Sequence, residues 1–216
     1  MADDGTTPDG TRYAGVVLAA GAARRMGGRP KALLERDGVP LVRRMALALL
    51  ESGVSEVVVV LGHRAEEVGS ALDGLPVRRH VHAGYLAGRV SSLRAGLAAL
   101  AVDVEAVLVA LADQPLIETG DVLDLIGAYE RRVDGTRVLV PRVAGVRGHP
   151  VVFDSGVCRE ILRGEPNFGV RQWIQSNPAQ VGWFDSENVV YCVDVDAPGD
   201  LERVAQHHRC AIRWSE

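Results

Sequence analysis

The chain has 216 residues, of which 47% are hydrophobic, 24% charged and 5% aromatic, and its formal net charge is −4 at pH 7. This size fits one domain of ordinary or slightly larger length, the mild acidity argues against a nucleic-acid partner, and the apolar runs are too short to span a membrane. Three cysteines without Cys-x-x-Cys spacing argue against a disulfide framework or a thiolate zinc site, so we expect a cytoplasmic protein.

Residues 1–12 are acidic and lack an apolar core segment, so we expect a short disordered tail there and no signal peptide. No Ser/Gly/Pro-rich linker divides the rest, and we expect residues 13–216 to form one domain. Short Val-rich runs alternate there with longer amphipathic segments, which is typical of a parallel sheet covered on both faces by helices. We therefore predict an α/β fold with three αβα layers, Rossmann-like, around a mostly parallel sheet.

The predicted elements follow in chain order. The strands of the first half are 13–20, 55–61, 77–81, 106–112 and 137–141, and its helices are 40–52, 65–72, 91–101 and 119–132. The second half is predicted to add strands 151–153, 181–184 and 189–193 and helices 170–176 and 198–209. Because ligands of open α/β sheets bind beyond the carboxyl ends of the strands, we look for functional residues in the segments that follow each strand.

Segment 21–31 follows the first predicted strand and carries three glycines, three arginines and one lysine. Glycines let backbone N–H groups approach a phosphate chain, and the cations match the charge of a triphosphate. We therefore predict a nucleotide-binding loop, with a solvated basic loop as the alternative. A P-loop is excluded because Ala32 follows Lys31, and a dinucleotide fingerprint is excluded by the glycine spacing and by the missing acid after the second strand.

Acidic residues follow two later strands. Asp113 comes directly after the fourth predicted strand, where a rigid carboxylate can bind magnesium, although a helix cap or turn is the alternative. Asp194 and Asp196 share one face if their strand continues through them. Asp196 also precedes a predicted helix, so it is open between a cap and a second metal ligand.

Five blocks of the sequence resemble the nucleotidyltransferases that attach a nucleotide to molybdopterin, in the same order and over nearly the whole chain. They are Leu18-Ala19-Ala20-Gly21 with Arg25-Met26-Gly27 and Lys31; Gly88 with Ser91-Ser92-Leu93; Ala112-Asp113-Gln114-Pro115; Arg147-Gly148-His149-Pro150; and Asp194-Val195-Asp196-Ala197-Pro198 with Asp200-Leu201. The Leu-Ala-Ala-Gly form is typical of the molybdenum cofactor cytidylyltransferases. The resemblance therefore implies Mg²⁺-dependent transfer of CMP from CTP to molybdopterin or the molybdenum cofactor, with release of pyrophosphate.

The resemblance and the residue pattern together imply roles for individual side chains. The expected catalytic residues are Arg25, Lys31 and Asp113, and the expected metal ligands are Asp113, Asp194 and Asp196. The expected nucleotide-binding residues are Leu18, Ala19, Ala20, Gly21, Ala22, Arg25, Gly27, Lys31, Gly62, Gly88, Ser91 and Ser92. The expected acceptor-binding residues are Arg147, Gly148, His149 and Pro150. The family also implies a phosphorylated, molybdopterin-type acceptor and a molybdenum hydroxylase as client.

The chain differs from the family at a few positions, which leaves the donor and acceptor open. It has His82 where relatives often have Asn, Arg89-Val90 in place of Met-Ser, and a divergent segment 164–171; the spacing before Lys31 is similar to the guanylyl branch. GTP as donor, or a sugar phosphate, polyol phosphate or phospholactate as acceptor, are the alternatives. His149 could instead be structural, and the chain could be a non-catalytic nucleotide- or cofactor-binding maturation factor. A nicotinamide-dependent oxidoreductase is disfavoured by its missing fingerprint.

Overall fold

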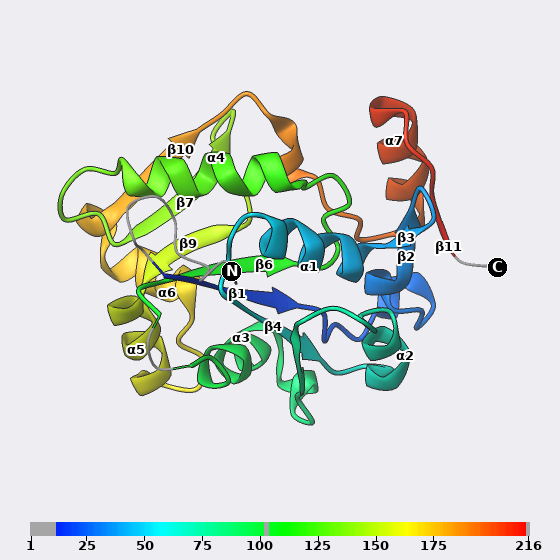
Figure 1. Ribbon diagram of the computed structural model, residues 1–216, viewed down its shortest axis with the longest axis horizontal. Coiled ribbons are helices and arrows are strands. Elements are labelled where there is room, and N and C mark those ends of the chain that lie inside the picture. Colours follow the sequence, from blue (N-terminus) through cyan, green and yellow to red (C-terminus); the bar gives the residue numbers. More distant parts are fainter. Residues whose placement is uncertain (1–11, 102–103, 215–216) are drawn as a thin grey trace, which may run out of the picture.

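Buried Val-rich strands form the centre of the fold in the computed structural model, which describes residues 12–101 and 104–214 (Figure 1). In chain order the strands are β1 (Tyr13–Leu18), β2 (Leu34–Arg36), β3 (Val39–Pro40), β4 (Glu56–Leu61), β5 (Arg78–Val81), β6 (Ala106–Leu111), β7 (Val138–Val143), β8 (Val146–Arg147), β9 (Val151–Asp154), β10 (Val181–Asp185) and β11 (Ile212–Trp214).

An 8-stranded sheet carries the order β10-β7-β9-β6-β1-β4-β5, with β8 paired to β7. Its neighbours β5, β4, β1 and β6 pair in parallel, as do β10 and β7, whereas β9 is antiparallel to both β6 and β7. The carboxyl ends of β1, β4, β5 and β6 therefore meet at one edge of the sheet.

Helices cover both faces of this sheet. They are α1 (Leu41–Glu51), α2 (Ala65–Ser70), α3 (Arg89–Ala98), α4 (Thr119–Glu130), α5 (Ser155–Arg163), α6 (Val170–Ser176) and α7 (Pro198–His208), with 3-10 turns η1 (Arg24–Met26), η2 (Lys31–Leu33), η3 (Tyr85–Ala87), η4 (Pro178–Gln180) and η5 (Val189–Cys192). Residues of α1, α2 and α4 share one buried cluster, and residues of α3, α5 and α6 share the other. Figure 1 shows α1 and α4 on one side of the strands and α3, α5 and α6 on the other. The expected three-layer α/β fold with a mostly parallel sheet is confirmed.

A small second sheet, β11-β2-β3, lies with α7 beside the carboxyl edge of the large one (Figure 1). Its buried cluster joins Met26 and Leu34, which follow β1, to Val195, Val204 and Ile212 from the far end of the sequence. Burial of these side chains fastens the C-terminal segment to the loop that follows β1.

Most elements were predictable, with bounds within three residues, but three details differ. The predicted strand 189–193 is wrong: η5 replaces it, because Tyr191 turns into the core and its carbonyl accepts hydrogen bonds from Gln114 (2.9 Å) and from the backbone N–H of His149 (2.9 Å). No strand continues through Asp194 and Asp196, so these residues do not share a strand face. Helix α5 and the small sheet were not predicted, although Asp154 caps α5 in a regular way.

Some sequence expectations fall outside this description. The expected disordered tail lies outside the described residues except for Arg12, which forms a β-bridge. Among the described residues, no helix has the length and apolar character that crossing a bilayer requires.

The close packing of α3 on the sheet gives a test of the fold. A Cβ atom on Gly96 would lie 2.5 Å from Val16 Cγ1 and 2.7 Å from Val60 Cγ2. We expect Gly96→Ala to lower the free energy of unfolding by roughly 1–3 kcal/mol, because neither β-branched neighbour can retreat within the packed sheet. In urea denaturation, Gly120→Ala on α4 is the matched control: its Cβ meets nothing within 4 Å, so it should be neutral or stabilising. Equal effects of the two substitutions would contradict the close packing.

Candidate active site

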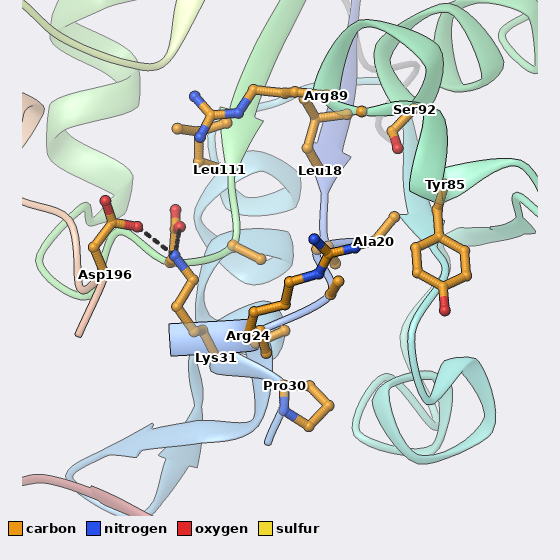
Figure 2. A pocket seen from close by; sticks show the side chains of 18 of the residues that line it. Leu18, Ala20, Arg24, Pro30, Lys31, Tyr85, Arg89, Ser92, Leu111 and Asp196 are labelled. Atoms are coloured by element: carbon orange, nitrogen blue, oxygen red, sulfur yellow. Dashed lines mark hydrogen bonds and ion pairs between the residues drawn. The ribbon is translucent and has the colours of Figure 1, made fainter. Parts of the chain in front are cut away.

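Segment 21–31 forms one wall of a cleft of about 390 Å³ (the loop cleft) at the carboxyl end of β1 (Figure 2). Ala23 and Gly27, with φ of 50° and 63°, take left-handed conformations on either side of η1 and reverse the chain there. The backbone N–H groups of Gly21, Ala22 and Ala23 donate to no other described residue. They are therefore available to an anion in the cleft.

Three of the four cations of this segment line the loop cleft: Arg24, Arg25 and Lys31. The fourth, Arg29, instead stacks over the ring of Trp214 at 4.2 Å. The positive charge that the sequence groups together is thus divided between the cleft and a contact with the small second sheet.

The opposite wall is the start of α3 and the turn before it. Arg89 and Ser92 from α3, its N-cap residue Gly88, and Tyr85 and Leu86 from η3 line this wall. The positive end of the α3 dipole therefore lies beside the cleft and favours a negatively charged ligand.

Gly62 lies behind this wall and allows Tyr85 and the backbone of Ala20 to pack closely against it. A Cβ atom on Gly62 would lie 2.7 Å from Cγ of Tyr85 and 2.8 Å from the backbone oxygen of Ala20. Gly62 is needed because Tyr85 lies directly against the end of β4 and the segment that follows β1.

Lys31 contacts two carboxylates beside the loop cleft. Its Nζ donates to Oδ2 of Asp113 and to Oδ1 of Asp196 (2.8 Å), and Figure 2 shows Lys31 pointing toward Asp196. Arg25 pairs with the same Asp196 oxygen at 3.0 Å. The side chains of Lys31 and Asp113 are only 18% and 16% exposed, so water screens their contact weakly. Lys31 is also the only lysine of the chain, against 23 arginines.

Hydrogen bonds of the backbone hold together the two segments that carry these carboxylates. The N–H of Val195 donates to the carbonyl oxygen of Asp113 (3.0 Å), which ties the C-terminal segment to the end of β6. The carboxylate of Asp200 accepts from the N–H groups of Asp196 and Ala197, both at 2.9 Å, and so caps α7. The cap alternative for Asp196 is therefore wrong: its side chain faces the two cations.

The charges of this cluster act on one another. Burial alone would lower the pKa of Lys31, but Asp113 and Asp196 outweigh it and hold that pKa above its ordinary value. The hydrogen bond from Lys31 lowers the pKa of Asp196. Asp194 contacts none of the described cations; burial, and then the charges of Asp196 and Asp113, raise its pKa. Lys31 and Asp196 are thus a charged pair at neutral pH, and Asp194 stands outside it.

The two carboxylates suit a divalent cation that also has ligands from elsewhere. Mg²⁺ prefers oxygen ligands and is usually held by one or two carboxylates together with phosphate and water oxygens. Within residues 12–101 and 104–214, no three His, Cys, Asp or Glu side chains converge as a closed protein site would require. Asp113 and Asp196 therefore fit a cation that is shared with a phosphorylated ligand.

A second cavity of about 680 Å³ (the side cavity) adjoins the loop cleft, and both are lined by Leu18, Arg89 and Leu111. Figure 2 shows Arg89 extending from α3 toward Leu111. The remaining walls of the side cavity are mainly apolar. They include Leu93, Val109, Val140, Val151, Val170 and Ile174, with the polar groups Arg147, His149, Arg171, Gln172 and Gln175. An anion in the side cavity would meet Arg89 at the boundary with the loop cleft, and Arg147 and Arg171 on the other walls.

The block Arg147–Pro150 is fixed against η5. His149 donates its backbone N–H to Tyr191, a Cβ atom on Gly148 would lie 2.6 Å from the same Tyr191 oxygen, and the His149–Pro150 peptide bond is cis. Burial, with the nearby charge of Arg89, lowers the pKa of His149 to about 4. The imidazole that lines the side cavity is therefore neutral at pH 7.

The structure brings most of the sequence-predicted residues together. Nine of the twelve predicted nucleotide-binding residues line the loop cleft: Leu18, Ala19, Ala20, Gly21, Ala22, Arg25, Lys31, Gly88 and Ser92. Of the other three, Gly27 ends η1, Gly62 lies behind Tyr85, and Ser91 Oγ contacts Nε2 of His82 at 2.5 Å. Arg147, Gly148 and His149 line the side cavity, and Pro150 follows them.

Sequence reasoning missed Tyr85, Leu86 and Arg89 as lining residues. One signal could have found them: they follow β5, whose carboxyl end lies at the same edge as that of β1. It also missed His63, whose Nε2 lies 2.7 Å from the carbonyl oxygen of Gly28 and fastens the loop to the end of β4.

Residues 15–181 match the family model described as a MobA-like NTP transferase domain. The nicotine blue oxidoreductase of Paenarthrobacter nicotinovorans is 34% identical over 205 residues, which are 90% of this chain and 94% of that protein. A probable molybdenum cofactor guanylyltransferase of Haloferax mediterranei is 32% identical over 161 residues, or 74% of this chain and 72% of that protein. Several further relatives are longer bifunctional proteins, of which the chain spans between 28% and 47%.

Among solved structures, Rv0371c from Mycobacterium tuberculosis H37Rv superposes with a TM-score of 0.76 at 27% identity. The match covers 91% of this chain and 98% of that one. A structure of the same mycobacterial protein in complex with manganese superposes with a TM-score of 0.73.

The Asp200 cap gives a pH-dependent test of how Asp196 is held. Contacts with Arg203 and with the backbone N–H of Asp196 lower the pKa of Asp200 from 3.8 to about 2. We expect Asp200→Asn to lower the free energy of unfolding by about 1 kcal/mol near pH 6, because it removes a negative charge from the first turn of α7. This advantage of the wild type should be complete above pH 3.8 and should fade as the pH falls toward 2, because the carboxylate is then protonated in both states. Urea unfolding at pH 6, 4 and 3 measures it, and a difference that stays constant over this range would contradict the charged cap.

Proposed function

The chain belongs to the family of MobA-like NTP transferase domains, and on that premise we propose that it transfers CMP from CTP to a molybdopterin-type phosphorylated acceptor with release of pyrophosphate. The observation that carries the proposal is the contact of Lys31 with Asp113 and Asp196 at the loop cleft, between a basic loop and a helix N-terminus. CTP is favoured because Leu18-Ala19-Ala20-Gly21 has the form typical of the cytidylyl branch.

The loop cleft offers the groups that a triphosphate needs. The N–H groups of Gly21, Ala22 and Ala23 would bind phosphate oxygens, while Arg25 and Lys31 would neutralise charge that collects on the leaving pyrophosphate. Arg24 lines the same cleft and would add to this neutralisation.

The side cavity is the proposed acceptor site. An acceptor phosphate between Arg89, Arg147 and Arg171 would lie next to the α-phosphorus of a nucleotide in the loop cleft. Its oxygen forms the new bond to that phosphorus, and the bond from the α-phosphorus to the bridging oxygen of the β-phosphate breaks as pyrophosphate leaves. The acceptor oxygen is already anionic at pH 7, so no general base is required, and neutral His149 would contribute a hydrogen bond.

A divalent cation, for which we propose Mg²⁺, fits the oxygen donors of Asp113 and Asp196. When bound, it would supply positive charge to the phosphate oxygens. Of the two open candidates for the second ligand we favour Asp196, because Asp194 does not contact Lys31. The manganese complex of the mycobacterial relative supports a divalent cation in this family.

Residues 182–214 lie beyond the family match, yet they supply Asp196, so we propose that residues 13–216 act as one NTP transferase domain. A cytoplasmic location and a molybdenum hydroxylase as client for the product belong to the same proposal.

An oxidoreductase is the second candidate. The relative whose match with this chain covers 94% of its length is named nicotine blue oxidoreductase. The chain has no dinucleotide fingerprint, and its second parallel strand ends in Leu61-Gly62-His63 without an acid for the ribose. Saturable NADH binding, with NADH oxidation in the presence of an aromatic electron acceptor, would favour this candidate over nucleotidyl transfer.

Donor and acceptor are tested together. We expect CTP, Mg²⁺ and molybdopterin to yield pyrophosphate and a cytosine dinucleotide, identified by mass spectrometry. GTP should be a poorer donor in the same assay. Transfer from GTP alone would place the chain in the guanylyl branch. Pyrophosphate release with a sugar phosphate, polyol phosphate or phospholactate, and none with molybdopterin, would replace the proposed acceptor.

Lys31 is tested by two substitutions that separate charge from shape. Lys31→Ala should slow transfer roughly a hundredfold, because a preorganised charge is lost. Lys31→Arg keeps the charge, but a planar guanidinium cannot place a compact point charge where the ammonium does, so we expect a loss of about tenfold or more. Single-turnover pyrophosphate release measures both. Wild-type rates in Lys31→Arg would show that position 31 needs charge alone, and near-normal rates in Lys31→Ala would remove Lys31 from the mechanism.

A further inference from the structure

We propose that Lys31 is an internal substitute for the divalent cation: in the nucleotide-free protein its ammonium occupies the position between Asp113 and Asp196, and it leaves this pair when the cation binds. The inference rests on the proposed function to the extent that the cation belongs to nucleotidyl transfer. Its structural basis is that a single Nζ atom donates to one oxygen of each carboxylate.

The carboxylates are fixed, whereas the lysine is not. The backbone of Val195 bonds to Asp113, the side chain of Val195 is fully buried, and Asp200 holds the N–H of Asp196. Lys31, in contrast, reaches the pair through a flexible four-carbon stem from the short turn η2. The pair is therefore a ready-made site for positive charge, and the lysine is the part that can move.

A cation and the ammonium cannot share this pair. Mg²⁺ requires oxygens at about 2.0–2.1 Å in near-octahedral geometry, whereas an ammonium hydrogen bond needs about 2.8 Å. Two positive groups packed against the same two oxygens would also repel each other strongly at this low exposure. Binding of the cation therefore displaces Lys31.

The displaced ammonium remains useful because Lys31 also lines the loop cleft. It would move from the two carboxylates toward the phosphates of the nucleotide. Before the nucleotide arrives, the lysine would thus give Asp113 its partner and would add to the contact of Asp196 with Arg25; afterwards it would deliver a charge to the nucleotide. A consequence is that nucleotide-free protein binds the cation weakly.

The first experiment measures Mn²⁺ affinity without nucleotide, by electron paramagnetic resonance of the free ion. Lys31→Met, which keeps the length of the side chain but removes its charge, should bind Mn²⁺ roughly tenfold more tightly than the wild type. Arg24→Gln is the matched control: it removes an equal charge from the same cleft, and among the described residues Arg24 pairs with no carboxylate. Its affinity should stay close to that of the wild type.

The outcomes of this experiment are distinct. Unchanged or weaker Mn²⁺ binding in Lys31→Met would overturn the inference, as would an equal gain in Arg24→Gln, which would indicate only a general effect of charge. Adding Asp113→Asn to Lys31→Met should abolish the gain; a gain that survives would place the ion elsewhere and overturn the inference as well.

The second experiment needs no variant, because Lys31 is the only lysine. Protein labelled with ¹³C at lysine Cε gives one lysine side-chain resonance. This resonance should shift and sharpen on titration with Mg²⁺, as the ammonium leaves its two partners. A resonance that stays unchanged at Mg²⁺ concentrations that saturate the site would overturn the displacement. These readouts are independent of turnover: displacement without transfer of any nucleotide would refute the proposed function alone, and transfer without displacement would refute this inference alone.

Discussion

The rest of the site depends on one ionic contact, in which a single ammonium group joins carboxylates that are 82 and 165 positions away in the sequence. Lys31 follows β1, Asp113 follows β6 and Asp196 precedes α7, so the contact unites the two ends of the described chain at the edge of the sheet. Two carboxylates and two cations within a partly buried corner are stable only if each charge has a defined partner. The hydrogen bond from Val195 to Asp113 and the Asp200 cap hold the backbone on both sides of Asp196, so that Asp113 and Asp196 lie where Lys31 can contact both.

Arg89 lies at the boundary between the two cavities of the site. It lines both the loop cleft and the side cavity, and Leu18 and Leu111 from the two central strands lie at the same boundary. The nucleotide and acceptor sites that we propose are therefore adjacent because of the strand order. Strands β1 and β6 pair directly, and their last residues, Leu18 and Leu111, line both cavities. The neutral imidazole of His149 leaves the positive charge on the acceptor side to the arginines.

The sequence was sufficient to predict the α/β class, most of the helices that cover the sheet, and eleven residues that line the loop cleft, which are the nine given above with Asp113 and Asp196. Buried strands and glycine-rich loops have strong local patterns. Prediction from the sequence failed where the deciding interactions join residues that are far apart in the chain. Segment 189–193 reads as a strand, yet the carbonyl of Tyr191 is used by Gln114 and His149, so the segment becomes a turn. Spacing could not show which of Asp194 and Asp196 contacts Lys31, because that contact depends on the hydrogen bond from the N–H of Val195 to Asp113, a residue far away in the sequence. Strands as short as β2, β3 and β11 carry too few residues to show a period.

The attachment of β11 to β2 bears on the order in which the molecule is made. The chain is synthesised from the N-terminus, and the large sheet needs no residue beyond β10. Asp196 and strand β11, which pairs with β2, come later. In the order of synthesis, the strands of the large sheet therefore precede Asp196, and the contacts of Lys31 are completed only by a part of the chain that lies beyond the residues matched to the family.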